Sequence, residues 1–142
     1  MAKALADTPA KITLYSDAAL AIAAAKADLA LVGADAILGD GSFANKTGTL
    51  PLALTCRYYG IPLYVASELS KVYHGPAADL AMEMRPPQEL AGDWDLARKG
   101  RVEVLNQFFE VIPAEYVTAY LTERGLLTPQ RVVEEARALG AD

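Results

Sequence analysis

Two short apolar segments constrain the fold of this chain more than any other feature. Residues 27–34 (ADLALVGA) and 61–67 (IPLYVAS) are apolar apart from Asp28 and Ser67 and lack the alternation of a half-exposed strand. Such runs are typical of parallel strands that helices cover on both faces. We therefore expect 27–34 to be a central parallel strand and 61–67 to be a second buried strand, with Pro62 at its start.

A helix is expected between these two strands, starting near Asn45 or Thr47 and ending at Tyr59. Gly60 then takes the position after the helix that tolerates a positive φ. Strands alternating with helices predict an α/β fold. The prediction is a single domain over residues 1–142, a three-layer Rossmann-like lobe with a mainly parallel sheet flanked by helices.

Shorter patterns predict the remaining elements. Residues 68–101 contain prolines and no sustained periodicity, so they are expected to be mostly loop with short helical pieces. Before residue 68 we expect a strand over 11–17, a helix over 18–26 capped by Ser16 or Asp17, and a hairpin joining 36–38 to 42–44. After residue 101 we expect extended segments over 102–106 and 108–112, and then a helix over 113–125 from Pro113 to Gly125. A last helix is expected over 128–140, with Thr128 as its cap, Pro129 as its first residue and Gly140 as its stop.

Composition excludes several classes of function. The chain carries thirteen Lys and Arg against eighteen Asp and Glu, a net charge of −5, so a basic face for nucleic acid is not expected. It has one cysteine and one histidine, which argues against a disulfide or a structural metal site, and no cofactor is predicted. Without a signal peptide or a membrane-spanning apolar run, we expect a soluble cytoplasmic protein that does not bind membranes.

Asp35 follows the first apolar run, where a parallel sheet binds its ligands. A carboxylate that is partly desolvated there can exchange protons near neutral pH, which makes Asp35 a candidate general acid or base. The alternative is that Asp35 only caps the turn that follows it. The residues alone leave both interpretations open.

Asn45 and Lys46 precede the expected helix, whose free N–H groups and positive dipole end favour an anion. The loop can therefore hold a phosphorylated ligand, or it can be an ordinary helix start with a solvated lysine. The stretch GDGSFANKTGT does not have the spacing of a Walker loop, and no dinucleotide fingerprint follows the strand.

The other reactive or aromatic side chains have simpler interpretations. Cys56 is expected to be a small packed apolar residue, and His74 a solvated loop residue. Trp94 and the stripe of Phe108, Phe109, Tyr116 and Tyr120 are expected in the core or in an interface rather than as a stacking platform, because the chain lacks the accompanying positive charge.

Two blocks of the sequence resemble a known family. Residues 31–72 contain G-A-D, a glycine-turn hairpin, N-K-x-G-T, a helix and G-I-P-x-Y-V-A, and residues 106–129 resemble that family's closing segment. The family joins the α, β and δ subunits of translation initiation factor 2B to methylthioribose-1-phosphate isomerase and ribose-1,5-bisphosphate isomerase. The closing segment of the family is expected to contain an amphipathic helix.

The resemblance implies a catalytic role for Asp35 and substrate contacts for Asn45 and Lys46, with Gly33 and Gly48 in the same motifs. In the isomerase members the aspartate works with a cysteine to interconvert an aldose phosphate and a ketose phosphate without a metal. That cysteine precedes these motifs, together with a helical N-terminal domain and phosphate-binding arginines, so Cys56 does not match it. Half of the acid/base pair is therefore missing from these 142 residues.

Three functions are compatible with this pattern. The first is a stand-alone domain that binds a phosphorylated sugar, a nucleotide-like ligand or a partner chain without being a complete isomerase. The second is a sugar-phosphate aldose–ketose isomerase completed by a separate N-terminal-domain chain or by oligomerisation. The third is an interaction lobe. A homodimer is expected in which residues 106–127 contribute apolar area.

Overall fold

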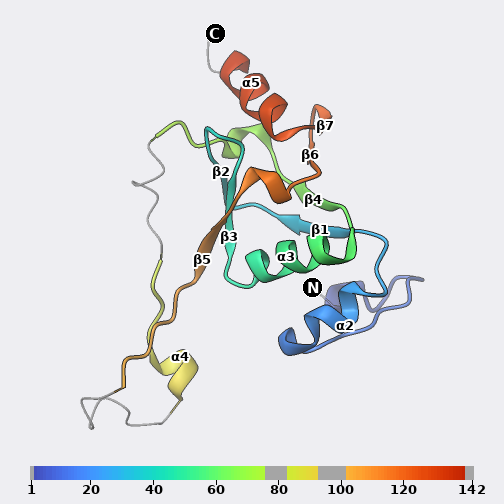
Figure 1. The fold of residues 1–142 in the computed structure, drawn as a ribbon, viewed down its shortest axis with the longest axis vertical. Helices are drawn as coiled ribbons and strands as arrows, with labels where there is room; N and C mark the ends of the chain where they lie inside the picture. The colour runs from blue at the N-terminus through green and yellow to red at the C-terminus, as the bar shows by residue number, and fades with distance from the viewer. Residues whose placement is uncertain (1, 76–82, 93–101, 140–142) are drawn as a thin grey trace.

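The computed structural model describes residues 2–75, 83–92 and 102–139 (Figure 1). The helices are α1 (Ala2–Leu5), α2 (Leu20–Ala24), α3 (Thr49–Tyr59), α4 (Gln88–Ala91) and α5 (Pro129–Leu139), with 3₁₀ turns η1 (Asp17–Ala19), η2 (Leu69–Lys71) and η5 (Ala114–Tyr116). The strands are β1 (Ala30–Gly33), β2 (Ala36–Ile37), β3 (Phe43–Lys46), β4 (Leu63–Ala66), β5 (Phe109–Ile112), β6 (Ala119–Thr122) and β7 (Gly125–Leu127). Along these residues, no helix has the length and apolarity needed to cross a membrane.

The main sheet has the strand order β1-β4-β6-β7. Strands β1, β4 and β6 are parallel, and β7 runs antiparallel to β6. A second sheet, with the order β2-β3-β5, is antiparallel throughout. The predicted α/β class, with a mainly parallel sheet flanked by helices, is confirmed, as are the 36–38/42–44 hairpin and the strand within 61–67.

One part of the strand prediction is wrong, because β1 is an edge strand of the main sheet and not a central one. Among the described residues it pairs only with β4, in a register that joins Ala30 to Leu63 and Gly33 to Ala66. Its side chains alternate between half-buried and exposed, and Leu31 is 57% exposed. The apolar run therefore marks a strand that this chain covers on one face only.

The predicted helix over 113–125 is also wrong. The segment instead makes the short 3₁₀ turn η5 and then the antiparallel pair β6 and β7, with Thr122 opposite Gly125. Tyr120 is fully buried, and its ring meets the edge of Phe43 with the ring centroids 6.2 Å apart. Backbone pairing with β4 and burial of Tyr120 outweigh the local helical pattern.

The N-terminal segment differs from its prediction as well. Residues 11–16 form no strand and are exposed, and they pair with no described strand. The helix expected over 18–26 is present as η1 followed by α2, and Ser16 precedes η1 without a side-chain capping bond. Residues 102–106 are extended but lie outside the strands.

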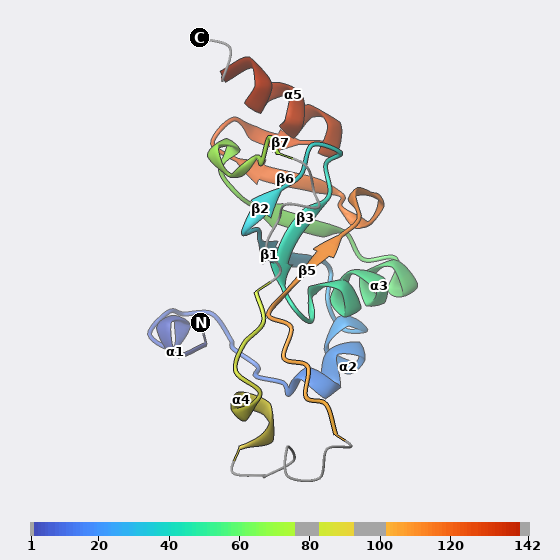
Figure 2. The ribbon, with the colours of Figure 1, turned by 90° about the vertical axis from the view of Figure 1, so that its left-hand side faces the viewer.

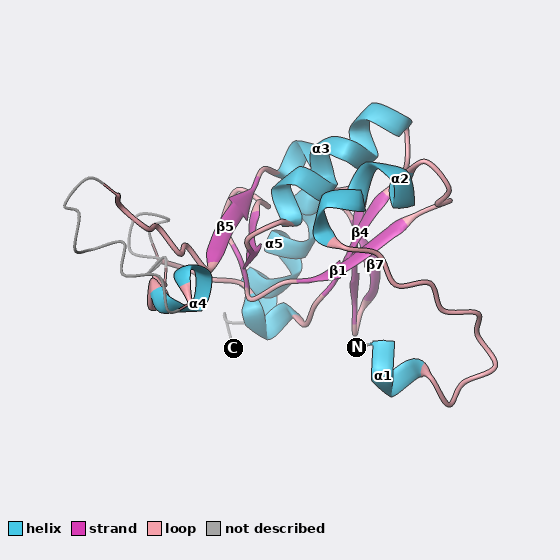
Figure 3. Cartoon of the chain, turned by 90° about the horizontal axis from the view of Figure 1, so that it is seen from below, coloured by secondary structure: helices cyan, strands magenta, loops and turns pink. Residues whose placement is uncertain are grey.

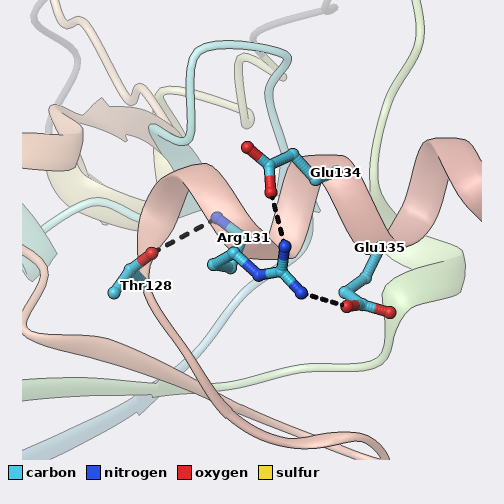
Figure 4. Close-up of polar contacts among 4 residues, drawn as sticks. All are labelled: Thr128, Arg131, Glu134 and Glu135. Atoms are coloured by element: carbon cyan, nitrogen blue, oxygen red, sulfur yellow. Dashed lines mark hydrogen bonds and ion pairs between the residues drawn. The ribbon is translucent and has the colours of Figure 1, made fainter.

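Helix α3 begins at Thr49, later than predicted, so Asn45 and Lys46 lie in β3. Gly48 precedes it with a φ of +107°, and Gly60 follows it with a φ of +69°, as expected for that position. Helix α5 begins at Pro129, and the backbone N–H of Arg131 donates to Thr128 Oγ1 at 3.3 Å, which confirms Thr128 as its cap (Figure 4). Gly140 and Trp94 lie outside the described residues.

A hydrophobic core joins the two sheets to α3 and α5. Its buried members come from β2, β3, β4, β5, β6, α3, α5, η2 and the segments that connect them. Figure 3 shows α3, α5 and β5 on one side of β1, β4 and β7. An extended arm with α4 projects from this body (Figure 2), and its two runs are joined by bonds such as Phe108 N–H to Glu83 O at 2.9 Å.

Candidate functional site

The end of β1 brings Asp35 close to the N-K motif through the backbone. The peptide N–H of Asp35 donates to the carbonyl of Ala44 at 2.9 Å, and Ala44 is the residue before Asn45. Asp35 is exposed, and its carboxylate accepts no hydrogen bond from another described residue. The turn-capping interpretation of Asp35 therefore gains no support, and the carboxylate is accessible to a ligand.

Gly33, at the end of β1, has open space around its Cα. A Cβ added there would meet no atom within 4 Å, so packing does not require a glycine at this position. Gly48 differs, because its φ of +107° is one that side-chain-bearing residues rarely adopt. Gly48 is therefore needed for the chain to turn from β3 into α3.

Asn45 and Lys46 are adjacent in β3 but make different contacts. The Asn45 amide donates to Thr49 Oγ1 at 3.1 Å, and Thr49 Oγ1 in turn donates to the carbonyl of Lys46 at 2.7 Å. The ammonium of Lys46 lies 3.5 Å from the ring centroid of Phe108 and 4.4 Å from that of Phe109. These rings hold the lysine by cation–π attraction.

The N-terminus of α3 already holds an anion, and that anion belongs to the chain itself. Glu110 Oε1 accepts hydrogen bonds from Gly48 N–H at 2.7 Å and from Leu50 N–H at 2.8 Å. These are the free helix N–H groups at which the sequence predicted a phosphate to bind. The expected phosphate position at this helix start is therefore occupied by a carboxylate from β5.

A hollow of about 370 Å³ lies beside this helix start, lined by Asp17, Leu20, Lys46, Thr47, Gly48, Thr49 and Pro51. It includes Lys46 and Gly48 but not Gly33, Asp35 or Asn45. A phosphate in this hollow would face the Asp17 carboxylate as well as the Lys46 ammonium.

Lys71 is a site residue that the sequence analysis did not single out. Its ammonium donates to the carbonyl of Ala34 at 2.7 Å, which places a positive charge next to Asp35. Tyr73 N–H donates to Ile37 O at 2.7 Å and ties the segment after η2 to β2. Lys71 could have been found from the sequence, since it is a basic residue a few positions after the 61–67 strand. Parallel strands end at the same edge of a sheet, so residues that follow the two strands lie near each other.

Cys56 is packed in the interior and His74 is in an exposed loop, as predicted from the sequence. Cys56 is buried in α3, and this burial raises the pKa of its thiol. His74 is exposed in the loop after η2. Within the described ranges, no group of three or more His, Cys, Asp or Glu side chains is arranged to hold a metal ion.

Comparison with known proteins matches the fold and motifs to one family. Residues 1–129 match the model of the initiation factor 2 subunit family. The chain therefore belongs to the initiation factor 2 subunit family, as the two sequence blocks predicted.

Named relatives of this chain include sugar-phosphate isomerases and an initiation factor. The ribose 1,5-bisphosphate isomerase of Haloferax volcanii is 39% identical over 140 residues, which is 97% of this chain and 43% of that protein. The solved 5-methylthioribose 1-phosphate isomerase of Pyrococcus horikoshii superposes with a TM-score of 0.80 at 31% identity, over 95% of this chain and 40% of its own. The solved translation initiation factor eIF-2B from the same organism superposes with a TM-score of 0.76 at 34% identity. That match covers 93% of this chain and 45% of the initiation factor.

The chain thus spans less than half the length of these relatives. The matched part of each relative corresponds to the lobe described above, which carries Asp35, Asn45 and Lys46. The rest of each relative has no counterpart in these 142 residues.

Proposed function

We propose that this chain is a sugar-phosphate-binding lobe of the initiation factor 2 subunit family that is not a complete isomerase by itself. One observation carries the proposal, namely the convergence of three segments at the end of β1. Lys71 bonds to the residue before Asp35, and Asp35 bonds to the residue before Asn45. The backbone of Asp35, the residue before Asn45 and the Lys71 ammonium thereby meet at the edge where parallel sheets bind ligands.

This set of groups suits a phosphorylated polyol. A lysine ammonium attracts phosphate as a point charge, and an asparagine amide and an aspartate carboxylate can bond sugar hydroxyls. Two of the named relatives are isomerases of ribose 1,5-bisphosphate and 5-methylthioribose 1-phosphate, which belong to this chemical class.

A complete aldose–ketose isomerisation needs more than this lobe offers. The reaction moves a proton between adjacent carbons, and Asp35 is one acid/base group without a second. Cys56 does not serve as that second group, because it is buried within α3 and its thiol pKa is raised. The geometry therefore supports binding more strongly than turnover.

Thermal melting with and without sugar phosphates tests the proposal, since a ligand that binds the native state raises the melting temperature. Ribose 1,5-bisphosphate and 5-methylthioribose 1-phosphate are expected to stabilise the protein more than inorganic phosphate. Loss of one charged hydrogen bond, in Lys71→Ala or Asp35→Asn, should weaken binding roughly 10- to 100-fold. Lys26→Ala, an exposed lysine outside the site, is the matched control. Equal melting temperatures with and without every sugar phosphate would contradict the proposal.

A second candidate function is an isomerase that is completed by further polypeptide. The observation that favours it is the main-sheet face that carries Leu31, Leu121 and Leu126, whose side chains the described residues leave largely exposed. Parallel sheets are normally covered on both faces, and more than half of the length of each solved relative lies outside the matched part and could supply the cover.

An isomerisation assay tests whether this chain turns over substrate by itself. Conversion of ribose 1,5-bisphosphate to its ketose can be followed by NMR with the 142-residue chain alone. The first proposal expects ligand-dependent stabilisation without conversion. Conversion by this chain alone, abolished by Asp35→Asn, would overturn it in favour of an enzyme.

A further inference from the structure

The turn between β6 and β7 carries a carboxylate that the proposed ligand site does not contain. Thr122 pairs with Gly125, so Glu123 and Arg124 form a two-residue hairpin turn. Both oxygens of the Glu123 carboxylate accept a hydrogen bond from the backbone N–H of Leu69, each at 3.2 Å. Donor and acceptor are 54 residues apart in the sequence. Glu123 therefore joins the last hairpin of the main sheet to η2.

The turn η2 that Glu123 contacts also carries Lys71, the cation of the proposed ligand site. The turn spans Leu69–Lys71, and a backbone bond from Lys71 N–H to Glu68 O at 3.1 Å closes it. Leu69 is 3% exposed and belongs to the hydrophobic core. A 3₁₀ turn closed in this way leaves little freedom between its first and last residues. The place where Leu69 is held therefore determines where the Lys71 side chain starts.

The chain on either side of η2 is anchored by backbone bonds. Ser67 N–H donates to Leu121 O at 3.0 Å, and Tyr73 N–H donates to Ile37 O at 2.7 Å. Between these anchors, Glu123 is the one side chain, among those described, that bonds to the backbone of η2. Its carboxylate is thus placed to set how η2 directs its lysine.

We propose that Glu123 is a positioning residue that acts on Lys71 through the backbone of η2. It holds the Lys71 ammonium on the carbonyl of Ala34, which precedes Asp35 and accepts a hydrogen bond from the ammonium at 2.7 Å. Among the described ion pairs, none joins Glu123 to Lys71, so the carboxylate acts through the turn and not by direct attraction. The inference rests on the proposed function only in taking Lys71 to contact the ligand.

A carboxylate suits this role for two reasons. An ionised carboxylate only accepts hydrogen bonds, and its bonds to backbone N–H groups are roughly twice as strong as neutral ones. Glu123 is also exposed, so its charge stays in contact with water and costs little to desolvate. The alternative is a carboxylate that only stabilises the hairpin. That alternative predicts a loss of stability in Glu123 variants without any change at Lys71 or Asp35.

The backbone amide of Asp35 reports the Lys71 bond, because its nitrogen is attached to the carbonyl carbon of Ala34. Nitrogen-15 NMR of the unliganded chain compares Glu123→Ala with Lys71→Ala. Both variants are expected to shift the Asp35 amide resonance in the same direction. The double variant should shift it no further than Lys71→Ala alone, because the two residues act through one contact. Glu123→Gln keeps an acceptor oxygen and should restore most of the unmodified shift.

Calorimetric titration with ribose 1,5-bisphosphate extends the comparison to ligand binding. Glu123→Ala is expected to weaken binding roughly 3- to 10-fold, which is the equilibrium effect of one ordinary hydrogen bond, and Glu123→Gln should weaken it less. Glu115→Ala is the matched control, because it removes an exposed carboxylate that pairs with Arg57 and not with η2. The control should leave both the Asp35 amide and the affinity unchanged. Circular dichroism melts without ligand check that each variant is folded at the titration temperature.

Two results would overturn the positioning role. The first is an Asp35 amide that Glu123→Ala leaves unshifted, and the second is a Glu123→Ala effect that persists in full in the Lys71→Ala background. Glu123→Asp, whose shorter side chain draws the carboxylate away from Leu69, takes the same comparison if the alanine variant does not fold. If no sugar phosphate binds the unmodified chain, the proposed function fails, and the Asp35 amide still decides the role of Glu123.

Discussion

At the scale of single residues, the tip of the β2–β3 hairpin is held by contacts that reach distant parts of the chain. The backbone of Gly41 has a φ of +82°, and a Cβ at Gly41 would lie 2.8 Å from the carbonyl oxygen of Pro129. The buried hydroxyl of Tyr120 donates to the carbonyl of Gly41 at 2.8 Å. Glycine is therefore required here both for its conformation and for the space at the start of α5.

The Asp40 side chain is expected to stabilise this turn in a pH-dependent way. Hydrogen bonds from the hydroxyl and the backbone N–H of Ser42 lower the pKa of Asp40 from its ordinary value of 3.8. Because the pKa is lowered in the folded state, the stabilisation is present above pH 3.8 and is lost as the pH falls through the folded value.

Thermal melts of Asp40→Ala at neutral pH and below pH 3 test this effect. The variant should be less stable at neutral pH by about 1 kcal/mol or less, since the turn is exposed, and the difference should shrink in acid. Asp28→Ala, at an exposed aspartate with no side-chain hydrogen bond to the described residues, is the control. A deficit of equal size at both pH values would contradict the assignment.

At the scale of elements, Glu110 connects β5 to the start of α3. Strand β3 pairs with β5 so that Asn45 lies opposite Glu110, which brings the carboxylate to the two free N–H groups of the helix. The turn that carries the N-K motif is thus held from a strand sixty residues later in the chain. The shape of the candidate site depends on this pairing.

Glu110→Ala is expected to destabilise the chain by about 1–2 kcal/mol, because it leaves two helix N–H groups without their acceptor. Glu110→Gln keeps an acceptor oxygen, so its loss in the free energy of unfolding should be roughly half that of Glu110→Ala. Urea denaturation measures both, with Glu103→Ala, at an exposed glutamate, as control. If Glu110→Ala and the control unfold at the same urea concentration, Glu110 does not hold the helix start.

At the scale of the whole molecule, the two faces of the main sheet differ. Val65 and Tyr120 are fully buried on the face that packs on the core, whereas Leu121 and Leu126 lie on the opposite face, where Leu126 is 63% exposed. The register places Ala66, Leu121 and Leu126 in one row across three strands. In the part of the chain that the structure describes, this face of the main sheet is therefore exposed around Leu121 and Leu126.

Lysine substitutions on the two faces should behave differently. Leu126→Lys is expected to change the free energy of unfolding by no more than about 0.5 kcal/mol, because the side chain is already in water. Val65→Lys buries an unpaired charge and is expected to cost several kcal/mol, roughly 3–5, which is enough to unfold a marginal domain. Thermal melts of the two variants compare these costs, and equal destabilisation would show that the Leu126 face is covered in solution.

The features that the sequence predicted correctly depend on contacts between near neighbours. Gly60 after α3, Thr128 and Pro129 at the start of α5, and the Gly-Asp-Gly turn at 39–41 each act through backbone groups a few residues away. The family and its motif residues could also be recognised, because they lie in continuous stretches of the chain.

The remaining features depend on partners far away in the chain. Within residues 119–127, β6 pairs with β4 and β7 pairs with β6, whereas residues 11–16 pair with no described strand. Lys71 reaches the residue before Asp35, and Glu110 occupies the helix start, only after distant strands have paired. Hydrogen-bonding edges and buried faces arise only when the chain folds, so local patterns do not reveal which segments will meet.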